Sequence, residues 1–351
     1  MAQESLVRRE IQSQPRVWHQ VWLRLQEARQ TTGGVVLSQC WDGVYFIGCG
    51  STYNPALAAA ALHEQVTGQQ AFGVPSSEVA LFTTAVYPDA PGQSFLLVAL
   101  SRSGTTTETL LAVEQHQARG LPALAVTTQG NSPLVRQCQA ALVLAEGAEE
   151  SIPQTRSFTS MYLATQYLAG LMADDEAFIA ALGRLPAYAE DVLERSSRQA
   201  AQLAQAGWER IIYLGSGPYY GLACEGMLKA KEMGLAWSEA YHFPELRHGP
   251  IALVDERTLV IGLLSDTGGR VEQAVLSDAR ELGAITLAIG EQPPADLARH
   301  SIALQTGLSD QARGALYLLP LQLLAEECAR ARGLDPDAPR HLQPAVVLEG
   351  V

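Results

Sequence analysis

The sequence predicts an α/β protein with two tandem copies of one unit, each a doubly wound parallel sheet flanked by helices. First, short apolar runs alternate with helical patterns, which is typical of buried parallel strands and their crossover helices. Second, the same order of elements returns about 165 residues later, as expected of a tandem duplication. Third, 351 residues of which 47% are hydrophobic can form more than one core.

The first half begins with a helical segment and continues as strand–turn–helix units. Residues 1–40 carry apolar residues at helical spacing. A strand, a glycine-rich turn and a helix are then predicted in GVYFIGCGSTYNPALAAAALHEQVTG, and again in LLVALSRSGTTTETLLAVEQ. Two further short strands are predicted around a connecting segment in LPALAVTTQGNSPLVRQCQAALVLAEG.

The second half repeats this order after a helical bridge over residues 150–205. IYLGSG at 212–217 corresponds to YFIGCG at 45–50, and TLVIGLLSDTGG corresponds to SFLLVALSRSGT. The last helix is predicted to end at Gly333, with arginines in its last turn. We therefore expect four parts: an N-terminal helical segment (1–40), a first domain (41–190), a second domain (191–335) and a C-terminal tail (336–351).

Composition and charge exclude several classes of protein. The formal net charge of −13 would repel nucleic acid. No apolar run approaches the roughly eighteen residues of a membrane span, and the N-terminus lacks the apolar core of a signal peptide. The five cysteines are scattered, which argues against a disulfide framework or a zinc site. We expect a cytoplasmic protein that binds neither nucleic acid nor membrane and needs no metal or cofactor.

Hydroxyl groups are concentrated where one predicted strand passes into a helix. Between the strand and the helix stand Ser101, Arg102, Ser103, Gly104, Thr105, Thr106, Thr107 and Glu108. Backbone N–H groups at a helix start carry partial positive charge, hydroxyls add donors, and glycine allows close approach of a ligand. Helix capping alone needs only one Ser or Thr. The pattern therefore favours binding of a phosphate monoester. The corresponding loop of the second half has Asp266 among these positions and should bind anions less well.

A second strand-to-helix turn, Gly48 to Thr52, is a weaker signal. Tyr53 stands where the third glycine of a dinucleotide-binding turn would be, and no acidic residue completes such a site. NAD binding is therefore discounted. The sequence also lacks the phosphate loop of nucleotide triphosphatases and the paired histidines of zinc proteases.

Titratable residues gather between 225 and 254 in a chain with only 17% charged residues. Glu225, Lys229 and Glu232 share one face of a predicted helix, where solvated ion pairing is the ordinary alternative. The next segment adds His248 and other ionisable groups, and such a cluster indicates a site. A carboxylate such as Glu232 can move a proton between adjacent sugar carbons, and His248 can assist ring opening.

These stretches together resemble the SIS (sugar isomerase) phosphosugar-binding family, and above all the isomerase half of glucosamine-6-phosphate synthase. The resemblance runs from REIQSQP near the start to GLDPDAPRHL near the end. Its distinctive motifs are CGSTYN, SRSGTTTET, PQTRSFT, ACEGMLKAKE and EAYHFPELRHGP. It implies two tandem SIS domains, each a flavodoxin-like three-layer αβα sandwich.

The resemblance also implies roles for individual residues. The sugar phosphate and adjoining hydroxyls would be held by Thr52, Ser101, Arg102, Ser103 and Thr106, with Gln154 and Thr155 in a further sugar-contacting loop. Glu232 matches the base that transfers a proton between C1 and C2, and Lys229 matches its neighbouring lysine. His248 matches the ring-opening histidine, which often enters from the partner subunit. A homodimer with its active site at the interface is therefore expected.

The chain departs from the synthase in three ways. It shows no glutamine-hydrolysing domain ahead of this region, so we expect no ammonia to be produced within it. Pro344 stands where the synthase has an active-site lysine, which excludes chemistry by that amine. Arg102 and Arg156 replace a glutamine and a lysine, and an added guanidinium can pair with phosphate or with a carboxylate of an altered substrate.

The predicted function is a phosphosugar enzyme that acts on a hexose or amino-sugar 6-phosphate. Aldose–ketose isomerisation, deamination and deglycation share the C1–C2 proton transfer and stay open as alternatives. A non-catalytic phosphosugar sensor is the second hypothesis. The loss of the C-terminal lysine favours the sensor, whereas the presence of Glu232 and His248 favours the enzyme.

Overall fold

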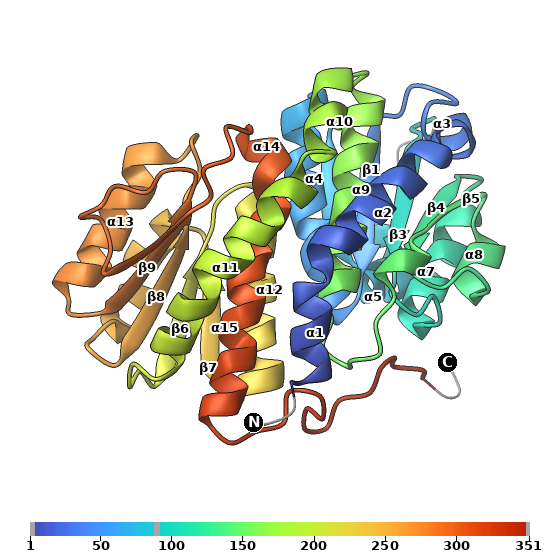
Figure 1. Ribbon diagram of the computed structural model, residues 1–351. Coiled ribbons are helices and arrows are strands. Elements are labelled where there is room, and N and C mark those ends of the chain that lie inside the picture. Colours follow the sequence, from blue (N-terminus) through green and yellow to red (C-terminus); the bar gives the residue numbers. More distant parts are fainter. Residues whose placement is uncertain (1–3, 88–91, 349–351) are drawn as a thin grey trace. The chain divides into compact units, whose positions relative to one another are not determined.

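The computed structural model describes residues 4–87 and 92–348 (Figure 1), and the chain divides into two units. The described residues of Arg16–Glu150, Arg156–Gly183 and Gln343–Val351 form one, here called the N-sheet unit. Those of Met1–Pro15, Ser151–Thr155 and Arg184–Leu342 form the other, here called the C-sheet unit. The domain limits expected from the sequence stay a prediction.

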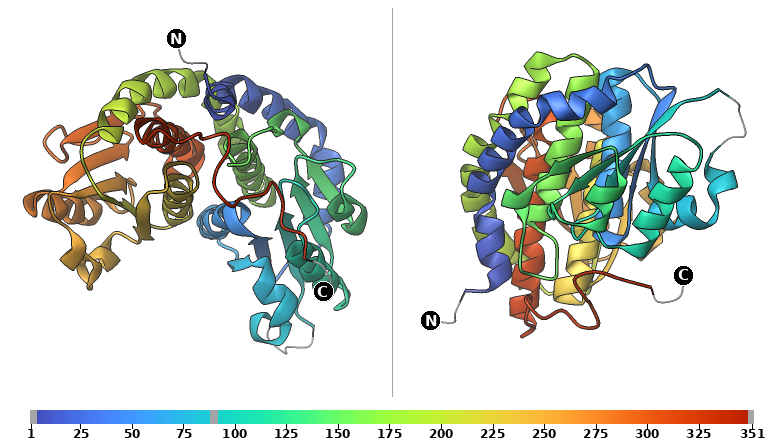
Figure 2. Two further views of the ribbon diagram at one scale, coloured as in Figure 1. Left: turned by 90° about the horizontal axis from the view of Figure 1, so that it is seen from below. Right: turned by 90° about the vertical axis from the view of Figure 1, so that its right-hand side faces the viewer.

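The N-sheet unit is built on five parallel strands in the order β2-β1-β3-β4-β5. They are β1 (Gly43–Gly48), β2 (Ala71–Pro75), β3 (Phe95–Leu100), β4 (Ala123–Thr127) and β5 (Ala140–Val143). Every residue of β1, β3 and β4 is buried, because helices cover both faces of the sheet (Figure 2). This explains why these strands read as continuous apolar runs.

Alternate side chains of β1 show the two helical layers of the N-sheet unit. Tyr45 and Ile47 pack in one core cluster with α5 (Ser76–Leu81), α7 (Thr107–Gln117) and α8 (Pro133–Gln137). Phe46 points the other way and meets His63 of α4 (Tyr53–Thr67), which packs on α9 (Arg156–Met172). The remaining helices of this unit are α2 (Gln14–Glu27, from Arg16 onward), α3 (Arg29–Val36), α6 (Thr83–Val86) and α10 (Glu176–Leu182).

The C-sheet unit has the same strand order when counted from its outer strand, β7-β6-β8-β9-β10, again all parallel. Its strands are β6 (Arg210–Leu214), β7 (Trp237–Tyr241), β8 (Thr258–Leu263), β9 (Ile285–Gly290) and β10 (His300–Ala303). Its helices are α1 (Leu6–Gln12), α11 (Leu185–Ala204), α12 (Pro218–Gly234), α13 (Gly269–Glu281), α14 (Asp310–Arg313) and α15 (Leu318–Ala331). The helix α15 packs on α1, α11 and α12, whereas α13 packs on β8 and β9.

The predicted α/β class with two doubly wound parallel sheets is confirmed, and the helical segments differ in detail. The N-terminal segment is three helices rather than one, and it ends at Val36. The predicted stop of the last helix is close to the observed one: α15 ends at Ala331, and Gly333 has a φ of +68°. No helix in the described ranges is long and apolar enough to cross a membrane.

The buried His116 of α7 makes the stability of the N-sheet unit depend on pH. Its ring lies 2.8 Å from the Tyr87 hydroxyl and 3.1 Å from the Pro122 carbonyl oxygen, with no exposed surface. Burial lowers the pKa of His116 to about 4, whereas an unfolded histidine titrates near 6.5. The unfolded chain therefore takes up the proton first as the pH falls, and stability that is complete above pH 6.5 is lost toward pH 4.

We expect the free energy of unfolding of the wild type to exceed that of His116→Gln most at pH 7. The difference should shrink by about 3 kcal/mol between pH 6.5 and pH 4, because glutamine does not titrate. Urea unfolding of both proteins across this range measures it. A difference that stays constant with pH would contradict the neutral, buried histidine.

Candidate functional site

The hydroxyl-rich stretch forms the turn from β3 to α7, here called the β3–α7 turn (Ser101–Thr106). Hydrogen bonds within the turn hold its conformation. The Ser101 hydroxyl accepts the Gly104 N–H at 3.1 Å, and the Ser103 hydroxyl accepts the Thr105 N–H at 3.2 Å. Gly104 has a φ of +63°, a conformation that favours glycine. Thr106 precedes the helix in an extended conformation. Four of these residues thus position one another before any ligand is considered.

This turn leaves backbone donors available at a helix start. Within the described ranges, the N–H groups of Ser103 and Thr106 have no acceptor. The helix that follows has 11 residues, so its first amides carry partial positive charge. The Thr106 and Ser101 hydroxyls lie 3.4 Å apart and add further donors. The arrangement fits a small dianion such as a phosphate monoester.

Thr52 lies in the neighbouring turn between β1 and α4 and fastens that turn. Its hydroxyl accepts the Cys49 N–H and donates to the Cys49 carbonyl oxygen, both at 2.9 Å. A Cβ on Gly48 would come within 2.2 Å of the Thr52 carbonyl oxygen, which explains the glycine at the strand end. Thr52 therefore sits beside the β3–α7 turn in the strand order, with its side chain already engaged.

Two of the three substitutions that distinguish this chain from the synthase pattern, Arg102 and Pro344, contact one another. The Arg102 guanidinium donates to the Pro344 carbonyl oxygen at 2.7 Å, and it lies 3.6 Å from the Glu149 carboxylate. Leu348 of the same tail donates its N–H to the Thr107 hydroxyl at 3.0 Å. In Figure 2 the last part of the tail runs beside the helices of the N-sheet unit. The tail therefore covers one side of the β3–α7 turn.

Glu149 is a residue of this region that the sequence did not reveal. Its side chain is completely buried and accepts a hydrogen bond from the Ser157 hydroxyl. A single glutamate in a loop gives no periodic or motif signal, so only the fold shows that it faces Arg102. Arg156 is engaged nearby, where its Nε donates to the Ala148 carbonyl oxygen at 2.8 Å.

Gln154 and Thr155 fall in the C-sheet unit and not with the β3–α7 turn. Thr155 is fully buried, and its carbonyl oxygen accepts a hydrogen bond from the Gln322 side chain at 3.2 Å. The Oε1 atom of Gln154 is buried and has no partner among the described residues. Gln154 therefore keeps an acceptor for a ligand, whereas the Thr155 backbone has a structural role.

The predicted helix cluster is a buried ion-pair network on α12. Lys229 is fully buried, its Nζ lies 3.3 Å from Glu225, and it donates to the Glu232 carboxylate. Burial alone would lower the pKa of Lys229, but the two carboxylates outweigh it and raise the pKa above its usual value. The solvated-pair alternative is therefore wrong for this helix. The Glu232 side chain stays 16% exposed, so it is the member of the network that a ligand can reach.

His248 follows a short helical turn (Pro244–Arg247) after β7. It is exposed, and its side chain makes no hydrogen bond or ion pair within the described chain. Its neighbour His242 stacks on Tyr220 with ring centroids 3.9 Å apart. The C-sheet unit thus contains both Glu232 and His248, and it leaves the histidine ring available to a ligand.

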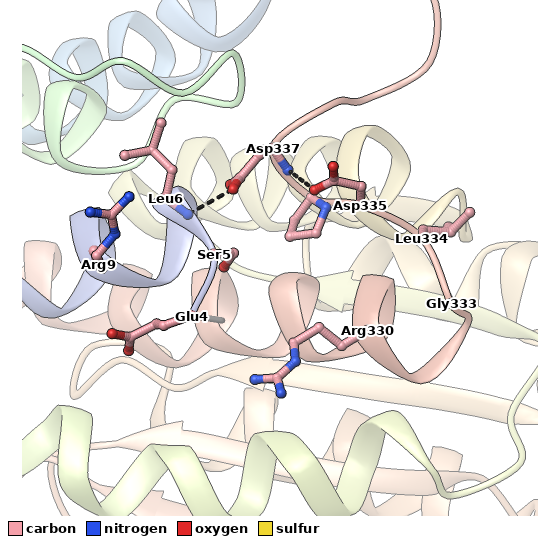
Figure 3. Close-up of a pocket in the computed structure, with 10 residues that line it drawn as sticks. Glu4, Ser5, Leu6, Arg9, Arg330, Gly333, Leu334, Asp335 and Asp337 are labelled. Atoms are coloured by element: carbon pink, nitrogen blue, oxygen red, sulfur yellow. Dashed lines mark hydrogen bonds between the residues drawn. The ribbon is translucent and has the colours of Figure 1, made fainter. Parts of the chain in front are cut away.

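A polar pocket of about 510 Å³ lies elsewhere in the C-sheet unit, between the start of α1 and the end of α15 (Figure 3). The Asp337 carboxylate accepts the N–H groups of Leu6 and Val7 at 2.7 and 2.9 Å, so the pocket wall is a helix cap. In Figure 3 the guanidinium of Arg9 points upward and that of Arg330 points down and to the left. None of the predicted site residues lines this pocket, and it is not the candidate site.

Removal of the central ammonium should show how much the α12 network stabilises the fold. We expect Lys229→Met to lower the free energy of unfolding by about 3–5 kcal/mol, because the completely buried Glu225 carboxylate loses its cation. Lys231→Met changes an exposed lysine of the same helix and should cost about 0.5 kcal/mol or less. Urea unfolding measures both values. Equal losses in the two variants would contradict a buried network.

A family model and curated proteins both match most of the chain. The SIS domain model matches residues 38–171 and 203–329, well over half of the chain. The glutamine–fructose-6-phosphate aminotransferase (isomerizing) of Pyrobaculum aerophilum is 34% identical over 317 residues, which are 87% of this chain and 51% of that protein. The corresponding protein of Mycolicibacterium paratuberculosis is 33% identical over 88% of this chain and 51% of its own. The chain thus spans about half the length of these relatives.

Solved structures resemble the chain over nearly its full length. Glucosamine-6-phosphate deaminase from Thermotoga maritima has a TM-score of 0.81 at 28% identity, covering 98% of this chain and 100% of that one. Tagatose-6-phosphate ketose/aldose isomerase from Escherichia coli has a TM-score of 0.86 at 22% identity, covering 98% and 96%. The second similarity concerns the fold alone.

Proposed function

Since the chain belongs to the SIS domain family, we propose that it is an enzyme that transfers a proton between C1 and C2 of a hexose or amino-sugar 6-phosphate. The names of two similar proteins point to this substrate class: an aminotransferase of fructose 6-phosphate and a deaminase of glucosamine 6-phosphate. Isomerisation, deamination and deglycation all pass through this proton transfer.

The observation that carries the proposal is the β3–α7 turn with its open donors. The N–H groups of Ser103 and Thr106, together with the hydroxyls of the turn, bind the phosphate dianion. The Arg102 guanidinium adds positive charge beside the turn, and Glu149 holds it in place. These groups fix the anionic end of the substrate and leave its carbon chain to other residues.

Glu232 is proposed as the base that takes the proton from one carbon and returns it to the next. Its partial exposure allows contact with substrate, and its carboxylate accepts a hydrogen bond from the Lys229 ammonium. His248 is proposed to open the sugar ring, because an imidazole can accept and return a proton. We propose that it serves the site of a partner subunit in a homodimer. Pro344 has no amine, so no step uses a lysine at that position.

The experiment that tests this function is a substrate panel. The purified chain is incubated with fructose 6-phosphate, glucosamine 6-phosphate and fructosamine 6-phosphates, and products are followed by NMR. We expect conversion of at least one of them. Binding without conversion across the panel would overturn the enzyme and favour a phosphosugar sensor, the function that the loss of the C-terminal lysine would suit.

A further inference from the structure

The C-sheet unit contains a second turn of the same construction, from β8 to α13, here called the β8–α13 turn (Ser265–Gly268). Its Ser265 hydroxyl accepts the Gly268 N–H at 2.7 Å, just as the Ser101 hydroxyl accepts the Gly104 N–H at 3.1 Å. Both turns follow the middle strand of a five-stranded parallel sheet with the same strand order. Both open a helix of more than ten residues. The two turns therefore share their place in the sheet and their serine-to-glycine hydrogen bond, although Gly104 has a φ of +63° and Gly268 a φ of −74°.

They differ in what their amides contact. The Asp310 carboxylate accepts the Asp266 N–H at 2.8 Å and the Thr267 N–H at 3.1 Å. The Thr267 hydroxyl lies 3.4 Å from the same carboxylate. In the β3–α7 turn the position that corresponds to Thr267 is Ser103, whose N–H has no acceptor among the described residues. A carboxylate of the chain thus stands where the first turn leaves room for an anion.

The Asp310 carboxylate is held in place from its other side. Arg313 has no exposed surface, and its guanidinium pairs with Asp310 and with Asp266. The Arg313 guanidinium also donates to the Leu308 carbonyl oxygen at 2.8 Å, and the Tyr219 hydroxyl lies 3.2 Å from Asp310. A buried guanidinium requires an anion nearby, because its desolvation is otherwise uncompensated. The amides of the turn and the Arg313 guanidinium therefore surround one carboxylate with hydrogen-bond donors.

We propose that the β8–α13 turn is a second anion-binding site whose resident ligand is the chain's own Asp310 carboxylate. The amides of this turn suit small carboxylate or phosphate anions. The Asp310 side chain occupies the turn and so excludes free anions. A phosphorylated ligand therefore binds at the β3–α7 turn alone, with one molecule per chain. The geometry of the second turn carries this proposal, and it does not depend on the reaction that the protein performs.

The test is rescue of an emptied site by a free carboxylate. Asp310→Ala should lower the melting temperature of the full chain, because two amides lose their acceptor and the buried Arg313 keeps Asp266 but loses Asp310 as an ion-pair partner. Sodium formate should raise the melting temperature of this variant by about 3 °C or more beyond sodium chloride of equal ionic strength. The wild type should show no such difference between the two salts. Formate acts on stability alone, so the result is independent of the sugar chemistry.

Two further variants distinguish binding of formate in the emptied turn from a general effect of formate on a destabilised protein. Asp310→Asn fills the turn with a neutral side chain of the same shape and should melt lower without a formate-specific recovery. Asp175→Ala removes a carboxylate that caps α10 through the Phe178 N–H at 2.9 Å, and it should also show none. If Asp310→Ala does not accumulate as folded protein, its refolding yield from urea in formate and in chloride is the readout. Equal effects of the two salts on Asp310→Ala would overturn the proposal.

Discussion

Turnover is expected to fall by about 10²- to 10⁴-fold when Glu232 is replaced by glutamine, whereas phosphosugar binding should stay near that of the wild type. Glutamine has the shape of glutamate but cannot take up a proton from carbon. The proposed phosphate contacts come from residues of the N-sheet unit, and we expect this substitution to leave them unchanged. Steady-state kinetics with the substrate found in the panel gives kcat, and calorimetric titration gives the dissociation constant.

The matched control is Glu281→Gln, which changes an exposed glutamate of α13 in the same unit. It should retain the turnover of the wild type. A Glu232→Gln variant that keeps full activity would exclude Glu232 as the base. A variant that loses binding and turnover together would show that Glu232 holds the substrate rather than moving its proton.

Gly104→Ala should weaken binding of the sugar phosphate by roughly 100-fold, the loss expected when two hydrogen bonds to a charged group are misplaced. A Cβ at this position would come within 2.2 Å of the Ser132 hydroxyl oxygen and 2.4 Å of its Cβ. The backbone must therefore shift, and the amides of Ser103 and Thr106 shift with it. Calorimetric titration of the variant with the sugar phosphate measures the change.

Gly120→Ala is the control for the backbone strain alone. Gly120 lies in the same unit with a φ of +78°, and its added Cβ would meet no atom within 4 Å. Both substitutions carry the cost of a left-handed alanine, about 1–2 kcal/mol, but only Gly104→Ala displaces the turn. Equal binding by the two variants would mean that the β3–α7 turn does not hold the phosphate.

The strands could be predicted because burial on both faces of the sheet requires a continuous run of apolar residues. β1 and β3 are six-residue apolar runs, and each is followed by a glycine- or hydroxyl-rich turn. The sequence pattern predicts only a connecting segment where the structure has helix α8, although Ser132 and Pro133 are a normal helix start. Its five residues are too few to show a helical period.

The sequence predicts residues of the candidate site where they form a local pattern. Spacing placed Glu225, Lys229 and Glu232 on one helix face, but it could not show that the network is buried, because burial depends on distant helices that pack on α12. The contacts of Arg102 with Glu149 and of Asp266 with Asp310 join residues more than forty positions apart. No periodicity encodes such pairs, and only the topology of the sheets brings them together.

A crystal structure of the protein with a bound sugar phosphate tests the central claim most directly. We expect the phosphorus atom over the amides of Ser103 and Thr106, the β8–α13 turn still filled by Asp310, and Glu232 as the carboxylate nearest to C1 or C2 of the sugar. A phosphate bound outside the β3–α7 turn would contradict the assignment of this turn. Sugar carbons beyond even a water-bridged contact with Glu232 would contradict its role as the base.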